Sequence, residues 1–473
     1  MTRGTVKAAA RALLAITTSL PCIAAAAPEG AFTGVGLSLL WGIPFVGLLL
    51  SLALWPLFAA DFWHHHYGKI TLAWAVAFLV PFTFVFGAGE TVHQVVHEVI
   101  LEYLPFVILL FALYTIAGGI AVRGTLQGTP TLNTAILTIG ALLASIMGTT
   151  GAAMLLIRPL LRANETRQRK VHIVVFFIIL VGNIGGALSP LGDPPLFIGF
   201  LKGVDFFWTT RALALPTLIL AGTLLTMFYL LDSYFWRSEN KAPPAIFTPL
   251  GVDGAFNFTL IAGVVAAVLL SGIWKPGIAF NIAGTDLQLQ NLVRDVLLLA
   301  LAFLSVALTP RTVRDANAFV WEPIAEVAKL FAGIFLTIIP VLAMLQAGRS
   351  GPLGAIVDLV TDRATGQSSH LMFFWTAGLL SAFLDNAPTY LVFFNLAGGD
   401  AKELMGPLEM TLAMISAGAV YFGALTYVGN APNFMIKAIA ESRGVAMPSF
   451  FAYFAYAAVV LLPLFSIITW IYS

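Results

Sequence analysis

Charge and cysteine are the two things that this sequence has little of. Only 10% of its 473 residues are Asp, Glu, Lys or Arg, whereas a soluble domain carries about 25%. The single cysteine, Cys22, excludes a disulfide framework, a zinc–cysteine site and a cysteine nucleophile from the body of the chain. A formal net charge of +1 without a run of basic residues argues against nucleic acid as a partner. The glycine-rich phosphate loop of ATP-driven transporters is also missing from the sequence.

Apolar residues take up the rest of the composition. They make up 59% of the chain, and the mean hydropathy is +0.93. The expected surroundings of the protein are therefore a lipid bilayer. Apolar runs of about 20 residues, the length that crosses a bilayer, occur at 35–57, 70–87, 99–120, 171–201, 212–233, 258–273, 290–308, 327–346, 409–440 and 449–472. They predict an all-α polytopic membrane protein with about ten transmembrane helices.

Two further apolar segments, 131–163 and 370–399, are interrupted at 148–151 and 385–388. Each predicts a re-entrant helical hairpin, which is tolerated only where protein or a water-filled cavity surrounds it. With the N-terminus outside, the cytoplasmic connections hold twice as many Lys and Arg residues as the external ones, in line with the positive-inside rule. The two hairpins would then be opposed, the first opening from the cytoplasm and the second from outside.

The first 27 residues are typical of a signal peptide. Arg3, Lys7 and Arg11 precede a short apolar run, and alanines at 24–27 provide a small-residue cleavage site. An uncleaved first transmembrane helix is the alternative. The remaining residues, 28–473, are predicted to form one transmembrane domain. A signal segment before such a domain predicts a multi-pass protein of the bacterial inner membrane, with the mature N-terminus in the periplasm.

An internal repeat is visible at an offset of 237 positions. GALSPLGDPPLFI at 186–198 recurs as GALTYVGNAPNFMI at 423–436, and the same offset places 148–151 on 385–388 without a gap. A match that joins both features predicts repeat 1 at about 131–201 and repeat 2 at about 370–440. Unrelated glycine and proline kinks in two helices are the alternative interpretation.

Inverted repeats with paired broken helices are typical of secondary transporters, whose binding site lies between the repeats near the middle of the membrane. Proline interrupts the helical hydrogen bonds, and glycine lets two backbones approach closely. The freed backbone groups can then act as ligands. The residues expected to make the breaks are Gly192, Pro194, Pro195, Pro388, Gly429 and Pro432.

Asp193 and Asp385 lie at the predicted breaks. A carboxylate inside a membrane is costly and marks a functional site. We therefore expect a site that binds sodium or a proton at these two aspartates, because competition between the two ions for one carboxylate is antiport. The alternative is that each aspartate only caps a half-helix.

Hydroxyl and amide oxygens near the breaks suit a hard cation. The polar residues expected to complete the site are Thr149, Thr150, Asn183, Ser189, Asn386, Thr389, Thr426, Asn430 and Asn433. Asn386 and Asn430 could instead make ordinary interhelical hydrogen bonds. No cofactor is expected, and sodium ions and protons are the expected transported or coupling ions.

Three motifs carry a resemblance to a known family. GALSPLGDPP, SAFLDNAPT and GALTYVGNAPN resemble motifs of the ion transporter superfamily, most closely its branch of citrate transporters and sodium:proton antiporters. The resemblance covers most of 35–473 and implies a homodimer. In dicarboxylate carriers of this fold, Ser-Asn-Thr hairpin tips bind sodium and carboxylate. This chain departs from them, with tips that read Gly-Thr-Thr-Gly and Asp-Asn-Ala-Pro.

Sodium/proton antiport is the first functional interpretation, because two aspartates repel an anion and the motifs contain no Lys or Arg. Sodium- or proton-coupled transport of citrate or a dicarboxylate is the alternative. An intramembrane aspartyl protease would leave the duplicated break unexplained, and residues 190–193 read Pro-Leu-Gly-Asp rather than Gly-x-Gly-Asp. We therefore expect no enzyme. A passive channel is the third class, and flux against a gradient would separate it from a transporter.

Overall fold

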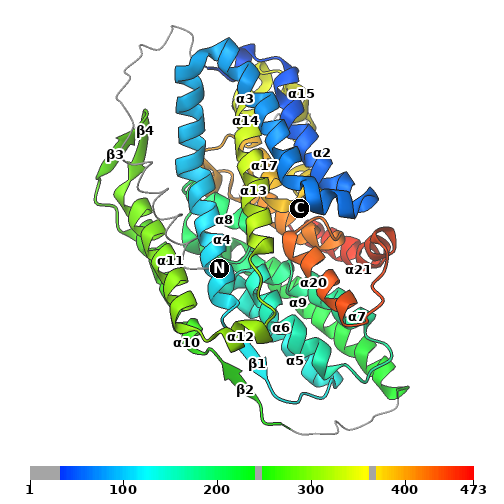
Figure 1. Ribbon diagram of the computed structural model, residues 1–473. Coiled ribbons are helices and arrows are strands. Elements are labelled where there is room, and N and C mark those ends of the chain that lie inside the picture. The colour runs from blue at the N-terminus through cyan, green and yellow to red at the C-terminus, as the bar shows by residue number, and fades with distance from the viewer. Residues whose placement is uncertain (1–31, 240–247, 362–368, 473) are drawn as a thin grey trace.

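The computed structural model describes residues 32–239, 248–361 and 369–472 (Figure 1). The predicted signal peptide, residues 1–27, lies outside this part of the chain. The helices of the first half are α2 (Ile43–Phe58), α3 (Ala60–Glu98), α4 (Leu104–Ala117), α5 (Pro130–Met147), α6 (Thr149–Ala163), α7 (Val171–Leu180), α8 (Pro194–Leu201) and α9 (Phe206–Arg237). A short π-helix, η3 (Val99–Tyr103), joins α3 to α4.

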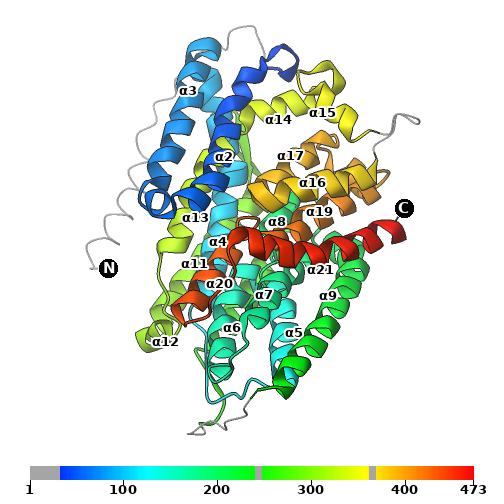
Figure 2. The ribbon, with the colours of Figure 1, turned by 90° about the vertical axis from the view of Figure 1, so that its right-hand side faces the viewer.

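The helices of the second half are α10 (Phe256–Ile273), α11 (Leu289–Leu308), α12 (Arg311–Ala316), α13 (Glu322–Thr337), α14 (Ile339–Gln346), α15 (Gly354–Leu359), α16 (His370–Leu384), α17 (Asn386–Leu396), α18 (Ala401–Met405), α19 (Glu409–Phe422), α20 (Ala431–Ser442) and α21 (Phe450–Ile471). Two antiparallel strand pairs join β1 (Ala121–Arg123) to β2 (Gly251–Asp253) and β3 (Ala279–Ile282) to β4 (Thr285–Gln288). Figure 2 shows α16 and α21 crossing the molecule between α2 and α3 at one end and α5, α6 and α9 at the other.

The prediction of an all-α polytopic membrane protein is confirmed. Among the described residues, eight helices are long and apolar enough to cross a membrane, and the pair α13–α14, bent by 44°, would make a ninth. About ten were expected. The predicted spans 70–87 and 99–120 lie on the two sides of Gly87, whose φ of 86° and ψ of 160° break the long stretch 61–117. Helix also continues through the polar residues at 61–69 and 88–98 that flank these spans. An apolar run cannot show by itself whether the polar residues that flank it leave the helix.

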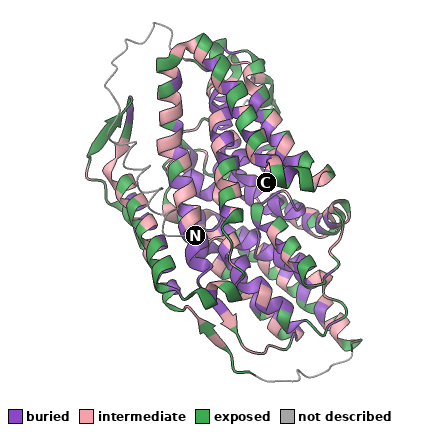
Figure 3. Cartoon of the chain, viewed as in Figure 1, coloured by how far each residue is buried: buried purple, intermediate pink, exposed green. Residues whose placement is uncertain are grey.

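The outer surface of the bundle is apolar, as lipid contact requires. Figure 3 shows exposed residues along the outside of α10 and α11 and buried residues through the centre. Large apolar side chains such as Phe84, Ile273 and Val459 are each more than three-quarters exposed. A water-soluble protein does not display so much apolar surface without a partner, so lipid is the solvent of this face.

The two predicted interruptions are breaks in the structure. Helices α5 and α6 meet at Gly148, and α16 and α17 meet at Asp385. Gly148 has φ 81° and ψ 150°, and Asp385 has φ 80° and ψ 146°. Residues 237 positions apart thus share a backbone conformation that is almost confined to glycine.

The two broken helices also match each other. Between α7 and α8 the chain runs through the 3₁₀ turn η4 (Ile184–Leu188), and between α19 and α20 through η6 (Gly423–Leu425). The Ser189 hydroxyl donates to the carbonyl of Ser145, and the Thr426 hydroxyl donates to the carbonyl of Ala382 at 2.5 Å. Each member of the second bond lies 237 positions after its counterpart. A hydroxyl therefore fastens each broken helix to the hairpin of its own repeat.

Glycine and proline make the breaks for the expected physical reasons. Pro194 and Pro195 lie in the first turn of α8, and Pro432 and Pro388 lie in the first turns of α20 and α17, where a missing N–H costs little. Gly192 and Gly429 lie where the backbone folds back against Gly186 and Gly423. A side chain has no room at either crossing.

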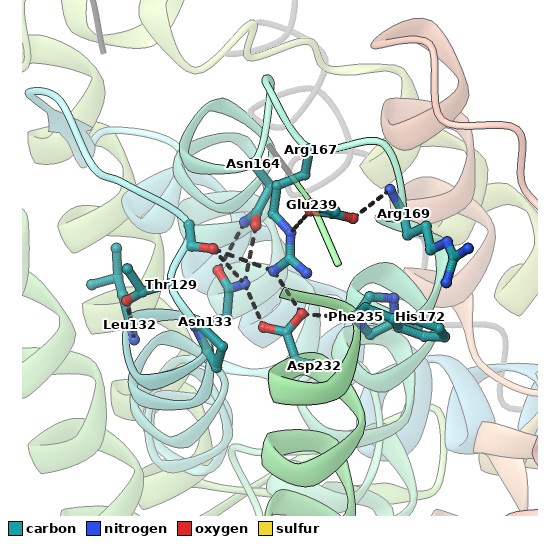
Figure 4. A network of polar contacts seen from close by, with 12 residues as sticks. Thr129, Leu132, Asn133, Asn164, Arg167, Arg169, His172, Asp232, Phe235 and Glu239 are labelled. Carbon is teal, nitrogen blue, oxygen red and sulfur yellow. Dashed lines mark hydrogen bonds and ion pairs between the residues drawn. The ribbon is translucent and has the colours of Figure 1, made fainter. Parts of the chain in front are cut away.

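A buried ion-pair network fastens the end of the first hairpin opposite its tip (Figure 4). Arg167, in the connection between α6 and α7, lies 2.6 Å from the carboxylate of Asp232 on α9, and these two side chains are 2% and 0% exposed. Asn133 of α5 and His172 of α7 bond to the same carboxylate at 2.9 Å and 2.8 Å. Glu239 binds the other edge of the guanidinium at 2.9 Å. Buried pairs of this kind can select one arrangement of helices even where they add little net stability.

The glycine crossing can be tested by Gly429→Ala. A Cβ at this position would lie 2.7 Å from the Gly423 carbonyl oxygen and 3.1 Å from that of Ala382. We expect a loss of about 1–3 kcal/mol, the usual cost of overpacking, seen as a lower apparent melting temperature by circular dichroism. Gly222→Ala is the matched control, because nothing lies within 4 Å of its Cβ position in α9. Equal melting temperatures for both variants would contradict the crossing.

Candidate ion-binding site

Asp193 precedes the first residue of α8 and is 1% exposed. Its backbone is extended, with φ −139° and ψ 141°, and its side chain accepts no capping hydrogen bond from α8. The interpretation of Asp193 as a simple helix cap therefore has no support in the structure. The carboxylate points to other elements instead.

Three neutral donors surround the Asp193 carboxylate. The Thr149 hydroxyl donates to Oδ1 at 3.3 Å, the Asn430 amide donates to Oδ1 at 2.9 Å, and the Asn386 amide donates to Oδ2 at 2.5 Å. Thr149 begins α6, Asn386 begins α17, and Asn430 directly precedes α20. Both hairpin tips and both helix breaks therefore meet at one carboxylate, as the sequence predicts.

No basic side chain balances this carboxylate. Every ion pair within the described ranges involves other acids. A buried charge without a counter-charge is expensive. Hydrogen bonds from neutral groups reduce that cost, and a proton or a bound cation would remove the net charge. The arrangement is therefore suited to a cation and poorly suited to an anion.

A second layer of amides ties the two breaks together. Asn183 donates to the carbonyl of Ile178 at 2.9 Å and to the side-chain oxygen of Asn433 at 2.8 Å. Asn433 in turn donates to the carbonyls of Gly423 and Thr426, both at 2.8 Å. These amides satisfy backbone groups that the breaks leave free, which a lipid environment demands.

Asn430 serves both layers. Besides its bond to Asp193, its side-chain nitrogen lies 3.1 Å from the carbonyl oxygen of Gly182. The alternative interpretation of Asn430 as an interhelical hydrogen-bonding residue therefore holds together with its place beside the carboxylate.

At the helix breaks and hairpin tips, two buried amide oxygens lack a hydrogen-bond donor among the described residues. They are Oδ1 of Asn386 and Oδ1 of Asn183, and both side chains are fully buried. The Asn386 oxygen belongs to the amide whose nitrogen bonds to Asp193, so it lies next to the carboxylate. Amide and carboxylate oxygens are ligands that hard cations prefer. Oδ1 of Asn386 is therefore the unpartnered oxygen that is placed to bind a cation together with Asp193.

Asp385 lies differently from Asp193. Its carboxylate accepts the backbone N–H of Asn386 at 2.7 Å, so it caps α17. The Thr389 hydroxyl donates to the Asp385 carbonyl at 2.8 Å. Asp385 and Asp193 thus share Asn386 as a neighbour, one through its backbone and the other through its side chain. The capping interpretation is supported for Asp385.

The remaining predicted residues take structural positions. Ser189 and Thr426 bond to hairpin carbonyls, and Thr150 makes no side-chain hydrogen bond within the described ranges. Ser145 was missed: its hydroxyl donates to Gly185 at 2.5 Å and accepts from the backbone of Leu188 at 3.1 Å. Its equivalent in the second repeat is Ala382, so the repeat contains no signal for it.

A family model described as "Putative citrate transport" matches residues 34–473. That range contains both hairpins and both breaks. No curated protein matches the chain.

The backbone of Asp385 generates a prediction. Asp385→Gly and Asp385→Ala both lose the cap on Asn386, but only alanine keeps the strain of a side chain at φ 80°. We expect the alanine variant to be less stable than the glycine variant by about 1–3 kcal/mol. Thermal unfolding of the two purified proteins measures the difference. An alanine variant as stable as the glycine variant would show that this backbone is not strained.

Proposed function

The chain belongs to the family described as "Putative citrate transport", and from that premise we propose that it is a secondary active transporter that binds its coupling cation at Asp193. Sodium/proton exchange is the reaction that we propose first. The observation that supports it is the buried Asp193 carboxylate, with three neutral donors and no basic neighbour. Such a site favours a cation over an anion.

The proposed exchange follows from the free-energy cost of burying the Asp193 carboxylate without a bound ion or proton. A proton neutralises Asp193, and sodium neutralises it too if oxygens such as Oδ1 of Asn386 complete the coordination. Without either ion, the site holds an unbalanced charge inside lipid, which is costly to bury. A protein that changes conformation readily only when the site is neutral exchanges one ion for the other.

Alternating access is proposed to come from the repeats. Hairpins α5–α6 and α16–α17 both reach Asp193. If they open to opposite sides, as the basic residues of the sequence indicate, movement of one repeat against the other would expose Asp193 to each side in turn. A bacterial inner membrane with the N-terminus outside is the location that we propose.

Citrate or another di- or tricarboxylate is the second candidate substrate, and the family description favours it. In that case the cation at Asp193 would drive uptake of the anion. The N-termini of α8 and α20 flank the site, and their helix dipoles favour negative charge.

Asp193→Asn is the test of the proposed site. The amide keeps the size of the side chain and is cheaper to bury than a carboxylate, so we expect the variant to fold. Proton-coupled sodium flux in proteoliposomes should fall at least about 100-fold, because a titrating carboxylate is lost and no neutral group replaces its charge. Asp315→Asn, an exposed position of α12, is the control.

If Asp193→Asn exchanges ions at the wild-type rate with an unchanged pH profile, Asp193 has no role in coupling. Asn430→Asp adds a second carboxylate to the same cluster, since Asn430 lies 2.9 Å from Asp193. Repulsion between two adjacent carboxylates makes the second proton of the pair harder to remove. We therefore expect the pH optimum of this variant to move upward.

The two candidate substrates can be separated by flux. If sodium/proton exchange is the reaction, an imposed sodium gradient should change the internal pH of the proteoliposomes in the absence of citrate. If citrate is the substrate, labelled citrate should accumulate and pH change should require it. Accumulation of either ion against its own gradient excludes a passive channel, and equilibration without accumulation would contradict secondary active transport.

A further inference from the structure

A pocket of about 170 Å³ lies at the end of the molecule where α6, β1 and α12 come together (Figure 1). Its walls are the strand β1 and the following Gly124, the last part of α6, Asp253 of β2, and Ala316 and Asn317 at the end of α12. At ~30 Å³ per water molecule, the space suits one small polar group. It lies apart from Asp193 and takes no part in the proposed ion site.

The lining of this pocket is strongly basic. Arg123, Arg158 and Arg162 face a single acid, Asp253. Arg443, which follows α20, is close enough to both Arg158 and Arg162 to repel them electrostatically. The like charges cost stability, and an anion in the pocket would relieve their repulsion.

Two of the three lining arginines have partners within the protein. Arg123 pairs with Asp253 at 2.9 Å, and Arg162 donates to the carbonyl of Val122 at 2.5 Å. Arg158 differs: its Nη1 is buried and has no hydrogen-bond acceptor among the described residues. A buried guanidinium nitrogen without an acceptor costs free energy, and a ligand oxygen would satisfy it.

We propose that this pocket binds an anionic oxygen group, a carboxylate or a phosphate, through Arg158 with help from Arg162. The planar guanidinium group can bind two oxygens of a carboxylate or of a phosphate by paired hydrogen bonds. Soluble di- or tricarboxylates and anionic lipid headgroups share this chemistry. The positive-inside count places the pocket on the cytoplasmic side.

Helix α6 joins the pocket to the ion site. Thr149, which bonds to Asp193, and Arg158 lie nine positions apart on this helix, which is about 14 Å along its axis. This part of the inference rests on the proposed function: a carboxylate held at Arg158 would lie on the cytoplasmic route to or from the site. Binding at the pocket itself does not require Asp193.

The test is equilibrium binding of labelled citrate to the full-length protein in nanodiscs of phosphatidylcholine. Arg158→Gln should weaken binding at least about 10-fold, the cost of one charged hydrogen bond, and Arg158→Lys should weaken it less. Arg311→Gln is the control, because it removes an exposed positive charge of α12 that does not line the pocket. Melting temperatures show whether each variant is folded, and Arg162→Gln replaces Arg158→Gln if that variant does not fold.

A second arm uses nanodiscs that contain phosphatidylglycerol. If lipid is the occupant, Arg158→Gln should reduce the phosphatidylglycerol retained by the purified protein, and citrate binding should not depend on Arg158. The proposal would be overturned if wild type, Arg158→Gln and Arg311→Gln all retained the same amount of phosphatidylglycerol and also bound citrate equally. The Asp193→Asn variant separates the pocket from the proposed function. Wild-type flux in this variant would contradict the proposed function. Citrate binding that still depends on Arg158 in this variant would support the pocket.

Discussion

The carboxylate of Asp193 has to be satisfied in a place that no basic side chain of the described chain reaches. Thr149, Asn386 and Asn430 satisfy it from three different elements, and each donor is available only because a helix breaks beside it. An unbroken helix in lipid would bond its own backbone and turn its side chains outward. The breaks, the hairpin tips and the amide layer behind them therefore serve one requirement: a carboxylate and the freed backbone groups inside the bundle have to be hydrogen-bonded.

The two repeats break the backbone in the same way but place their acidic side chains differently. The backbones of Gly148 and Asp385 agree closely, and the hydroxyls of Ser189 and Thr426 make equivalent bonds. The carboxylates do not correspond: the first repeat has its acid at the broken helix, and the second has its acid at the hairpin tip, where it caps α17. The two halves therefore share a backbone scaffold, and of these two carboxylates only that of Asp193 is bound by side chains alone.

Much of this site was visible in the sequence, because glycine, proline and polar residues stand out in apolar surroundings. The break positions and the gathering of Thr149, Asn386 and Asn430 around Asp193 were predicted. The extension of helix into the polar residues at 61–69 and 88–98 was not, since hydropathy detects only the apolar parts of a helix. The ion pair between Arg167 and Asp232 was not predicted either, because the sequence does not show whether a charged residue near a helix end faces water or a partner. Ser145 lacks a polar counterpart at Ala382, so the repeat could not reveal it.

The two ends of helix α6 are suited to ions of opposite charge. Its first residue bonds to a carboxylate that favours cations, and its last turns hold arginines that favour anions. The network of Arg167 and Asp232 fastens the chain just beyond this helix to α9, so movement of α6 relative to α9 would strain a buried ion pair. If the hairpin has two positions, an anion at Arg158 and a cation at Asp193 would each favour the position that binds it better. Linkage then requires each ion to change the affinity of the other by the same factor. Coupling between cation and anion would need no direct contact between them, only a rigid helix whose two ends contact the two ions.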